Sequence, residues 1–218
     1  MATYLDITRW PRRASFDYFR AFDKPYFNVC TRVDVSRLKP AVAEAGVGGL
    51  SLACYFLALR LANEQEPFRY RLEDGRVRVH ERVHGSTTVL RDDDSIAFAY
   101  IDAADDFMTF AAAGTAAIAA ARERSAPFDP RLDEAAVLHF TTLPWIHFTS
   151  FSHARNWGRE DSVPKLAFGR IEADGARLWL PLSVEVHHAL MDGLHVGRFI
   201  EGFEAALQAP RPLLGLAA

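Results

Sequence analysis

The chain has 218 residues, half of them apolar, and its 25 Lys and Arg against 28 Asp and Glu give a net charge of −3. This composition is typical of a globular protein long enough to bury a core without disulfide or metal staples. No stretch concentrates Lys and Arg as a nucleic-acid-binding face would, and no apolar run approaches the roughly 20 residues of a membrane helix. Because the polar N-terminus lacks the apolar core of a signal peptide and two cysteines are too few for a disulfide framework, we expect a cytoplasmic protein.

Short β-branched runs alternate along the chain with longer runs of strong helix formers, which predict strands and helices respectively. In chain order we expect a strand at 27–35, a helix from Ser36 as N-cap to about Glu44, a helix at 50–62, a hairpin with arms at 69–72 and 77–80, strands at 86–90 and 96–101, a helix at 105–124, a loop with Pro127 and Pro130, a strand at 137–142, a hairpin with arms at 165–172 and 177–186, and a helix from about Gly193 to Leu207. No repeat or flexible linker interrupts this series. We therefore expect one α/β domain over residues 1–218, built on a mixed sheet with several antiparallel pairs.

The segment 181–199 concentrates the side chains that could carry chemistry. A strand that reads as buried runs into His187 and His188, and three residues later Asp192 and Gly193 begin a helix. A strand end is a rigid platform for a histidine, and Asp192 could brace the loop or accept the free N–H groups of the first helical turn. From these residues alone, a hydrogen-bonded structural histidine with a simple helix cap has nearly the same weight as a catalytic site.

Two adjacent histidines near an aspartate also suggest a metal site. Zinc sites typically place two histidines at i and i+4 on a helix, or add a third well-placed ligand. Adjacent residues on a strand point to opposite faces, so His187 and His188 are poorly placed to share one ion. We therefore expect no metal.

The string from His187 to His195 resembles the signature of the chloramphenicol acetyltransferase family, and its H-x-x-x-D-G core also occurs in dihydrolipoyl acyltransferase cores and in condensation domains of peptide synthetases. Three more segments resemble the same family in the same order: Trp10 to Arg13 with Phe16, Tyr18 and Phe19; Pro144 to Phe151 (PWIHFTSF); and Leu180 to Val184. Together they span nearly the whole chain. The resemblance implies a two-layer sandwich of a mixed sheet and helices, and an O-acetyltransferase that uses acetyl-CoA.

The resemblance also implies roles for four residues. His188 would be the general base that takes the proton of a substrate hydroxyl as its oxygen attacks the thioester of acetyl-CoA in one ternary complex, a task that suits a mostly neutral imidazole. Ser150 corresponds to the serine whose hydroxyl stabilises the oxyanion. Asp192 corresponds to an aspartate in a structural ion pair with an N-terminal arginine, which aligns best with Arg12 and competes with Arg13. His187 and His195 are expected to be structural.

Further positions are implied for the two substrates. Arg170 is a candidate to meet a phosphate of CoA, and Ala167 stands where the family usually has a threonine. The positions expected to line the acceptor pocket are Phe19, Pro25, Phe27, His147 and Ala167, with His153 as a further candidate. An apolar pocket there suits chloramphenicol or a similar small apolar alcohol.

The family works as a homotrimer with active sites between subunits, and the resemblance implies the same here. Condensation domains use two such folds in a chain of roughly twice the length, so a single copy would borrow its second wall from a neighbour. Ala167, His147 and His153 leave a different alcohol acceptor open. A non-catalytic trimer that binds a small ligand is a further alternative, although a pure binder needs no base beside an oxyanion donor. A lipoyl-bearing acyltransferase subunit is disfavoured because the chain has no Ala/Pro-rich linker.

Overall fold

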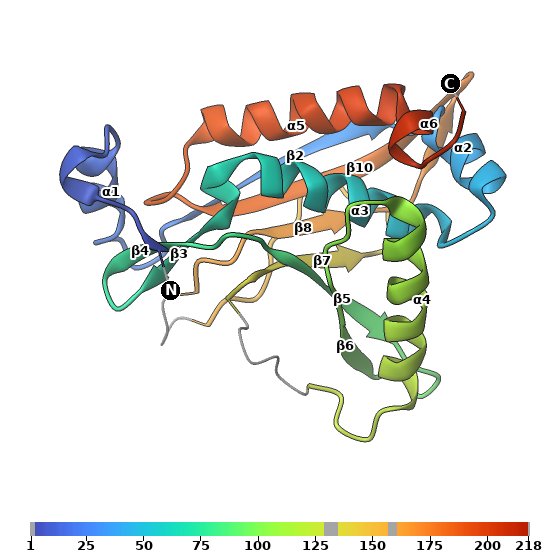
Figure 1. Ribbon diagram of the computed structural model, residues 1–218, viewed down its shortest axis with the longest axis horizontal. Coiled ribbons are helices and arrows are strands. Elements are labelled where there is room, and N and C mark those ends of the chain that lie inside the picture. Colours follow the sequence, from blue (N-terminus) through green and yellow to red (C-terminus); the bar gives the residue numbers. More distant parts are fainter. Residues whose placement is uncertain (1–2, 129–134, 157–160, 218) are drawn as a thin grey trace.

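A main sheet of seven strands organises the computed structural model, which describes residues 3–128, 135–156 and 161–217 (Figure 1). The strand order is β2-β10-β8-β7-β5-β6, and β9 pairs with the outer part of β10. β7 runs parallel to β5 and β8, and the other neighbours are antiparallel, so the sheet is mixed. The strands are β2 (Tyr26–Asp34), β5 (His84–Leu90), β6 (Ile96–Ile101), β7 (Val137–Thr142), β8 (Lys165–Phe168), β9 (Glu172–Asp174) and β10 (Arg177–His187).

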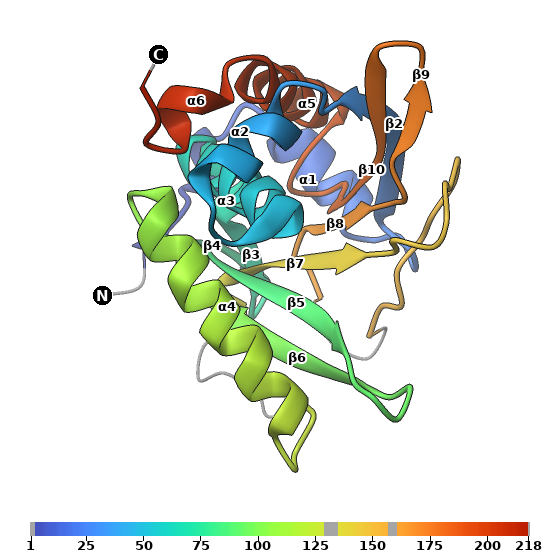
Figure 2. The same cartoon turned by 90° about the vertical axis from the view of Figure 1, so that its right-hand side faces the viewer.

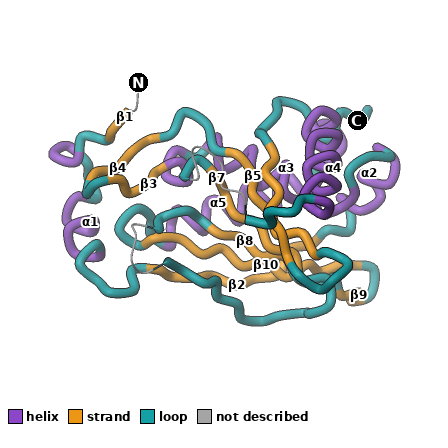
Figure 3. The backbone as a smooth tube through the Cα atoms, turned by 90° about the horizontal axis from the view of Figure 1, so that it is seen from below, coloured by secondary structure: helices purple, strands orange, loops and turns teal. Residues whose placement is uncertain are grey.

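The helices form a second layer on one side of this sheet. In Figure 1 the long helices lie above the strands or beside the β5–β6 pair, and the view from below in Figure 3 shows the central strands in front of the helices behind them. The helices are α1 (Arg13–Phe19), α2 (Leu38–Ala45), α3 (Gly49–Glu64), α4 (Phe107–Glu123), α5 (Gly193–Gln208) and α6 (Pro210–Leu213), with short 3-10 helices η1 (Ile7–Arg9) and η2 (Glu66–Arg69). A small sheet, β1 (Thr3–Tyr4), β4 (Arg76–Val79) and β3 (Tyr70–Glu73), lies near α1. The predicted two-layer α/β fold is confirmed.

Towards its C-terminal end, β10 presents apolar side chains to the helices and polar ones to the other side. On β10, Leu182, Val184 and Val186 are fully buried against the helices. Alternate residues on a strand point to opposite faces, so Ser183 and Glu185 lie on the side without helices, which we call the open face. The fold is therefore stabilised mainly on one side of the sheet.

Close approach of α3 and α4 depends on glycine. Gly48, just before α3, has φ +74°, and a Cβ there would lie 2.7 Å from the Cβ of Ala111. A Cβ on Gly114 of α4 would lie 2.7 Å from Leu52. Larger residues at these two positions would push apart helices that pack on the same part of the sheet.

Most predicted elements are present within a few residues of their predicted bounds, and β6 and β7 begin and end where predicted. Ser36 is not the cap of α2: the helix begins at Leu38, and the Ser36 hydroxyl bonds Asp34 and the backbone N–H of Leu178. The loop that was predicted to follow residue 124 includes Pro130, which lies outside the described residues. The elements that were not predicted are α1, α6, β1 and the 3-10 helices.

The first arm of the last predicted hairpin is divided into β8 and β9. The partner of Leu182 is Phe168 and the partner of Trp179 is Glu172, so four steps on this arm oppose three on β10. One extra residue is thus accommodated at the break. Pro181 has no N–H to offer the ladder there, and a Cβ on Gly169 would lie 2.9 Å from the ring of Pro181.

Among the described residues, no single helix is long and apolar enough to cross a membrane. Only α2 and α3 taken together pass that test of length and composition, and they are bent by 109° relative to each other.

Candidate active site

The end of β10 is tied to the start of β2, and this fixes the position of His188. The backbone N–H of His188 donates to the carbonyl of Pro25 at 2.7 Å. The chain then turns, with the N–H groups of Leu190 and Met191 donating to the carbonyl of His187 at 3.0 and 3.1 Å. Ala189, Leu190 and Met191 are fully buried, so the loop is held by packing as well as by hydrogen bonds.

Arg12 clamps this loop from the N-terminal segment. Its Nε donates to Asp192 Oδ2 at 2.7 Å and its Nη2 to Asp192 Oδ1 at 2.5 Å, a bidentate pair. The same guanidinium donates to the carbonyls of Ala189 and His188 at 3.0 and 3.1 Å. Hydrogen bonds from Arg12, followed by its charge, outweigh burial and lower the pKa of Asp192. Arg13, the competing assignment, lies 3.7 Å from Asp17 on the surface.

The imidazole of His188 is held between aromatic rings. It stacks on Phe19 with a centroid distance of 3.7 Å and an interplanar angle of 8°, and its centroid lies 4.7 Å from that of Phe27. Its Nδ1 lies 3.4 Å from Asp192 Oδ1 but makes no hydrogen bond. The side chain keeps 30% of its surface exposed. His188 is therefore fixed in orientation, partly accessible, and not bonded to a carboxylate.

The neighbouring histidines have structural contacts. His187 Nδ1 accepts from the N–H of Ala189 at 3.2 Å, and burial lowers the pKa of His187 to about 4. His195 Nδ1 accepts from the N–H of Asp192 at 2.9 Å, which satisfies a backbone donor at the start of α5.

Ser150 lies in an irregular segment, residues 143–156, on the side of the sheet away from the helices (Figure 2). The segment is tied to the sheet through the N–H of Leu143, which donates to Phe168 at 2.8 Å, and through the carbonyl of Ile146, which accepts from Arg170 at 2.8 Å. Ser150 is exposed and makes no hydrogen bond with any described residue. No hydrogen bond, ion pair or ring contact joins Ser150 to His188 within the described residues.

The remaining predicted positions divide among three places. Phe19, Pro25 and Phe27 contact His188. His147 and Arg170 lie together elsewhere: His147 Nδ1 is 3.4 Å from the carbonyl of Arg170. Arg170 also lines a cavity of about 270 Å³ with Ser51, Cys54 and Thr142 among its walls. Ala167 is fully buried on the open face, opposite Ser183.

Sequence reasoning missed a cluster of charged side chains on the open face. Arg155 donates through Nε to Glu185 at 2.8 Å and through Nη1 to Asp161 at 3.0 Å, and Lys165 Nζ donates to Asp161 at 3.2 Å. Burial tends to raise the pKa of Glu185, but contacts with His153 and the charge of Arg155 lower it to about 2. The sequence did contain a signal for this cluster: each of two otherwise apolar strands has a charged residue, Lys165 in β8 and Glu185 in β10. Across residues 3–128, 135–156 and 161–217, no group of three or more His, Cys, Asp or Glu is placed to hold a metal ion.

A sequence model of the chloramphenicol acetyltransferase family matches residues 1–204. The chain is 29% identical over 204 residues to chloramphenicol acetyltransferase 2 of Escherichia coli, and the alignment covers 91% of this chain and 93% of that protein. It is 30% identical over 210 residues to a chloramphenicol acetyltransferase of Streptomyces acrimycini, with 94% of each chain covered.

Solved structures show the same fold. A chloramphenicol acetyltransferase superposes with a TM-score of 0.82 at 24% identity, covering 95% of this chain and all of that chain. A dihydrolipoamide acetyltransferase of Azotobacter vinelandii superposes with a TM-score of 0.69 at 19% identity, covering 93% of this chain and 88% of that one.

Proposed function

Because this chain belongs to the chloramphenicol acetyltransferase family and is an acyltransferase, we propose that it transfers the acetyl group of acetyl-CoA directly to a hydroxyl of chloramphenicol or a similar small alcohol. The observation that carries the proposal is His188, which is held at a strand end by Arg12, Asp192 and Phe19 and is still partly accessible. A structural histidine would be expected to spend its ring nitrogens on hydrogen bonds, as His187 and His195 do at Nδ1.

His188 is the general base of this proposal. As the acceptor oxygen bonds to the thioester carbonyl carbon, the hydroxyl proton moves to the imidazole. When the tetrahedral intermediate collapses, the carbon–sulfur bond breaks and the imidazolium returns that proton to the sulfur of CoA. Stacking on Phe19 keeps the ring in one orientation through both steps, and no acyl-enzyme forms.

Ser150 supplies the hydroxyl that stabilises the oxyanion, and a second subunit brings it to His188. Within one chain no contact joins the two residues, and Ser150 lies exposed in a segment on the open face. An active site between subunits resolves this separation, because one copy presents His188 and its neighbour presents Ser150. We therefore propose the homotrimer that the family resemblance implies, with one site at each of the three interfaces.

In this proposal acetyl-CoA lies along the segment that carries Ser150 and beside Arg170, whose backbone N–H donates to Ile146 of that segment. Arg170 is exposed, and its guanidinium makes no hydrogen bond with the described residues, so it is available for a phosphate group. The cavity of about 270 Å³ that it lines gives the CoA arm a place beside Ser51 and Thr142.

The test of the reaction is thiol release from acetyl-CoA with chloramphenicol and with a panel of small alcohols. We expect release that depends on the alcohol, and a loss of about 10²–10⁴ in kcat for His188→Gln. His84→Gln is the control, since His84 lies outside the site and pairs with Asp102. Near-native turnover by His188→Gln would remove the base assignment. Binding of alcohols without any thiol release would favour a non-catalytic binding protein.

Complementation tests the shared site. Neither His188→Ala nor Ser150→Ala should be fully active alone, but trimers formed by coexpressing both in equal amounts should regain about one quarter of wild-type activity, because a random interface receives both intact residues that often. No recovery would mean that His188 and Ser150 act within one subunit or do not act together. Light scattering of the purified protein measures the oligomeric state directly.

A further inference from the structure

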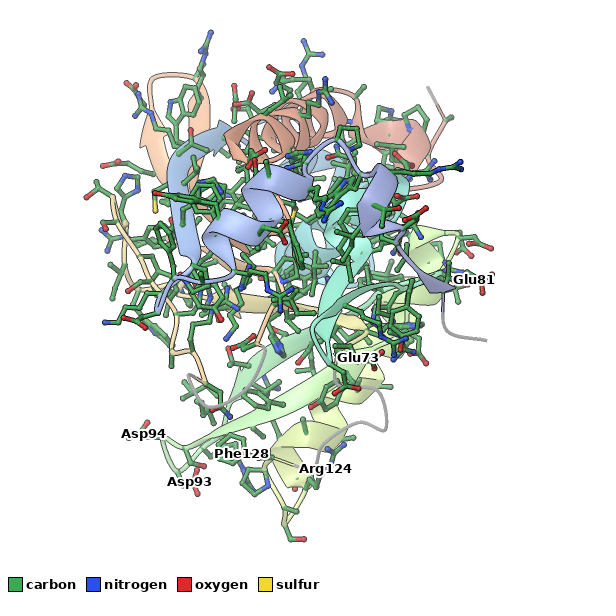
Figure 4. All side chains as sticks on the ribbon, turned by 90° about the vertical axis from the view of Figure 1, so that its left-hand side faces the viewer. Glu73, Glu81, Asp93, Asp94, Arg124 and Phe128 are labelled. Carbon is green, nitrogen blue, oxygen red and sulfur yellow. The ribbon has the colours of Figure 1, made fainter. Side chains whose placement is uncertain are left out.

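A cavity of about 850 Å³ lies on the open face and has two unlike walls. One wall is apolar and comes from β6, with Ile96 and Phe98. The other is polar and comes from the end of the Ser150 segment and from β8, with His153, Arg155 and Lys165. Figure 4 labels Phe128 beside the β5–β6 hairpin, where its ring packs on Phe98 with centroids 5.1 Å apart and supports the apolar wall.

Arg155 is the most constrained group of the polar wall. Its side chain is only 2% exposed, and its guanidinium lies over the ring of Tyr26 at 4.4 Å. Nε is used by Glu185, and Nη1 by Asp161 and the carbonyl of Val163. Nη2 is buried and has no hydrogen-bond partner among the described residues. One nitrogen of a fixed guanidinium is thus available to donate to a ligand.

Two other residues that line the cavity also have buried polar atoms without a hydrogen-bond partner among the described residues. Both ring nitrogens of His153 lack a hydrogen-bond partner in the described part of the chain. The Nδ1 of His153 is 3.8 Å from Glu185 Oε2, which is too long for a hydrogen bond. The hydroxyl of Ser86 is also buried and unpartnered there. A buried polar atom without a partner is costly, and three residues that line one cavity have such atoms, which indicates a ligand that satisfies them.

The formal charges of the polar wall are balanced. Arg155 and Lys165 are cationic and face the carboxylates of Asp161 and Glu185. Charge alone therefore does not select an ion here. Arg155 Nη2 on this wall and the hydroxyl of Ser86, on β5, are the buried donors that lack a partner among the described residues of the lining, so the complementary group is an oxygen that accepts hydrogen bonds.

We propose that this cavity binds the acceptor alcohol, and that the acceptor carries, at the end away from its reacting hydroxyl, an oxygen that accepts from Arg155 Nη2. The assignment as an acceptor rests on the proposed acetyl transfer: Ser150 stands three residues before His153 in the same segment. An aromatic or aliphatic body lies against Phe98 and Ile96, and the accepting oxygen lies against the polar wall. The substrate class is a small amphipathic alcohol rather than a wholly apolar one.

Three alcohols of nearly the same shape test the proposal: 4-(hydroxymethyl)benzoate, 4-(hydroxymethyl)benzamide and 4-isopropylbenzyl alcohol. They differ only in whether the group opposite the hydroxymethyl carries an accepting oxygen, charged or neutral, or two methyl groups. With the purified full-length protein, we expect kcat/KM from thiol release to be about tenfold to hundredfold higher for at least one oxygen-bearing alcohol than for the isopropyl compound.

The double variant Arg155→Met/Glu185→Gln removes the donor and its carboxylate partner together, and the Asp161–Lys165 pair remains. We expect the preference for the oxygen-bearing alcohol to fall to about one to threefold. Arg32→Met is the matched control, because Arg32 lies over Trp179 on the same face of the sheet but outside the cavity. Its preference should equal that of the wild type. His153→Leu gives a second, milder change in the same wall if the double variant does not fold.

The outcomes separate this inference from the proposed function. Thiol release with all three alcohols but no preference, or a preference that survives both Arg155→Met/Glu185→Gln and His153→Leu, overturns the inference and leaves the acetyl transfer intact. No thiol release with any alcohol overturns the acetyl transfer. Calorimetric titration with 4-(hydroxymethyl)benzoate and 4-(hydroxymethyl)benzamide then tests whether the cavity binds such a ligand. If either compound binds and its affinity falls about tenfold or more in the double variant, the assignment of the cavity is supported. If neither compound binds, that assignment is overturned.

Discussion

Side chains on the two faces of β10 are buried for different physical reasons. Toward the helices, Leu182, Val184 and Val186 are fully buried in an apolar core that includes Phe199 and Phe203 of α5. Toward the open face, the same strand buries a carboxylate and a hydroxyl, which are held by partners from other segments. Burial on the first face follows from hydrophobicity, and burial on the second requires specific hydrogen bonds.

This difference separates stability from chemistry. The helix-covered face is stabilised mainly by shape and apolar packing, and its hydroxyls bond one another, as Tyr55 does with Thr142 and Thr87. Within the described residues, ring nitrogens, one guanidinium nitrogen and a serine hydroxyl on the open face and at the strand end make no hydrogen bond. The same sheet thus provides a rigid support on one side and reactive groups at its end and on its other side.

The largest effect should come from the helix-covered face. Phe203→Ala should lower the free energy of unfolding by about 3–5 kcal/mol, because the side chain is fully buried and its removal leaves a cavity. Phe98→Ala on the open face should cost about 1 kcal/mol, because part of its ring meets solvent. Denaturant unfolding measures both, with Glu204→Ala on the exposed side of α5 as the control. An equal cost at Phe98 would show that another subunit covers the open face.

Ser150→Ala should affect only chemistry. We expect kcat to fall about 10²–10³-fold, equivalent to about 3–4 kcal/mol of transition-state stabilisation, because one oxyanion donor is lost. The melting temperature should stay the same, since the exposed hydroxyl bonds no described residue. Steady-state kinetics measures kcat, and thermal unfolding measures the melting temperature. A stable variant with normal kcat would place the donor elsewhere.

Arg12→Met tests the clamp that joins the N-terminal segment to the His188 loop. We expect a loss of about 1–3 kcal/mol in unfolding free energy, below the value for a fully buried pair, because the side chain of Asp192 is 36% exposed. Turnover should also fall, because the carbonyl of His188 loses its donor. Arg13→Met is the matched control and should change stability by less than about 0.5 kcal/mol. Equal effects of the two changes would contradict the assignment to Arg12.

The smallest effect concerns pH. Hydrogen bonds from Arg12 lower the pKa of Asp192 below its ordinary value of 3.8, so the folded state favours the carboxylate. The stability from this pair is fully present above pH 3.8 and is lost as pH falls through the lowered pKa. Unfolding of the wild type and of Asp192→Asn should therefore differ by a constant amount from neutral pH to about pH 5 and converge in stronger acid. A difference that widens in acid would have the wrong sign.

The regular elements could be predicted where a strand or helix has a clear period. Residues 96–101 and 137–142 were predicted with the bounds observed. The helix at 13–19 was missed because it is short and its N-cap residue, Arg12, makes no side-chain cap. The break at Gly169 was missed because it depends on Pro181, which is adjacent in the sheet but distant along the chain.

The candidate site could be predicted only in part. Family resemblance pointed to His188, Asp192 and an N-terminal arginine, and the structure brings Arg12 and Asp192 together across 180 residues of sequence. The same resemblance implied an apolar acceptor pocket. The sequence did not indicate the cavity on the open face, which has one charged wall built by Arg155, Asp161 and Lys165 around Glu185.

By itself, the sequence determined the class of fold and the presence of a histidine platform, because hydrophobic period and the H-x-x-x-D-G string are local along the chain. Only the tertiary structure decided that Arg12 rather than Arg13 holds the loop, that Ser150 and His188 do not meet within one chain, and that the open face carries a half-polar cavity. These features depend on strand order and register, which bring together residues that no local pattern relates.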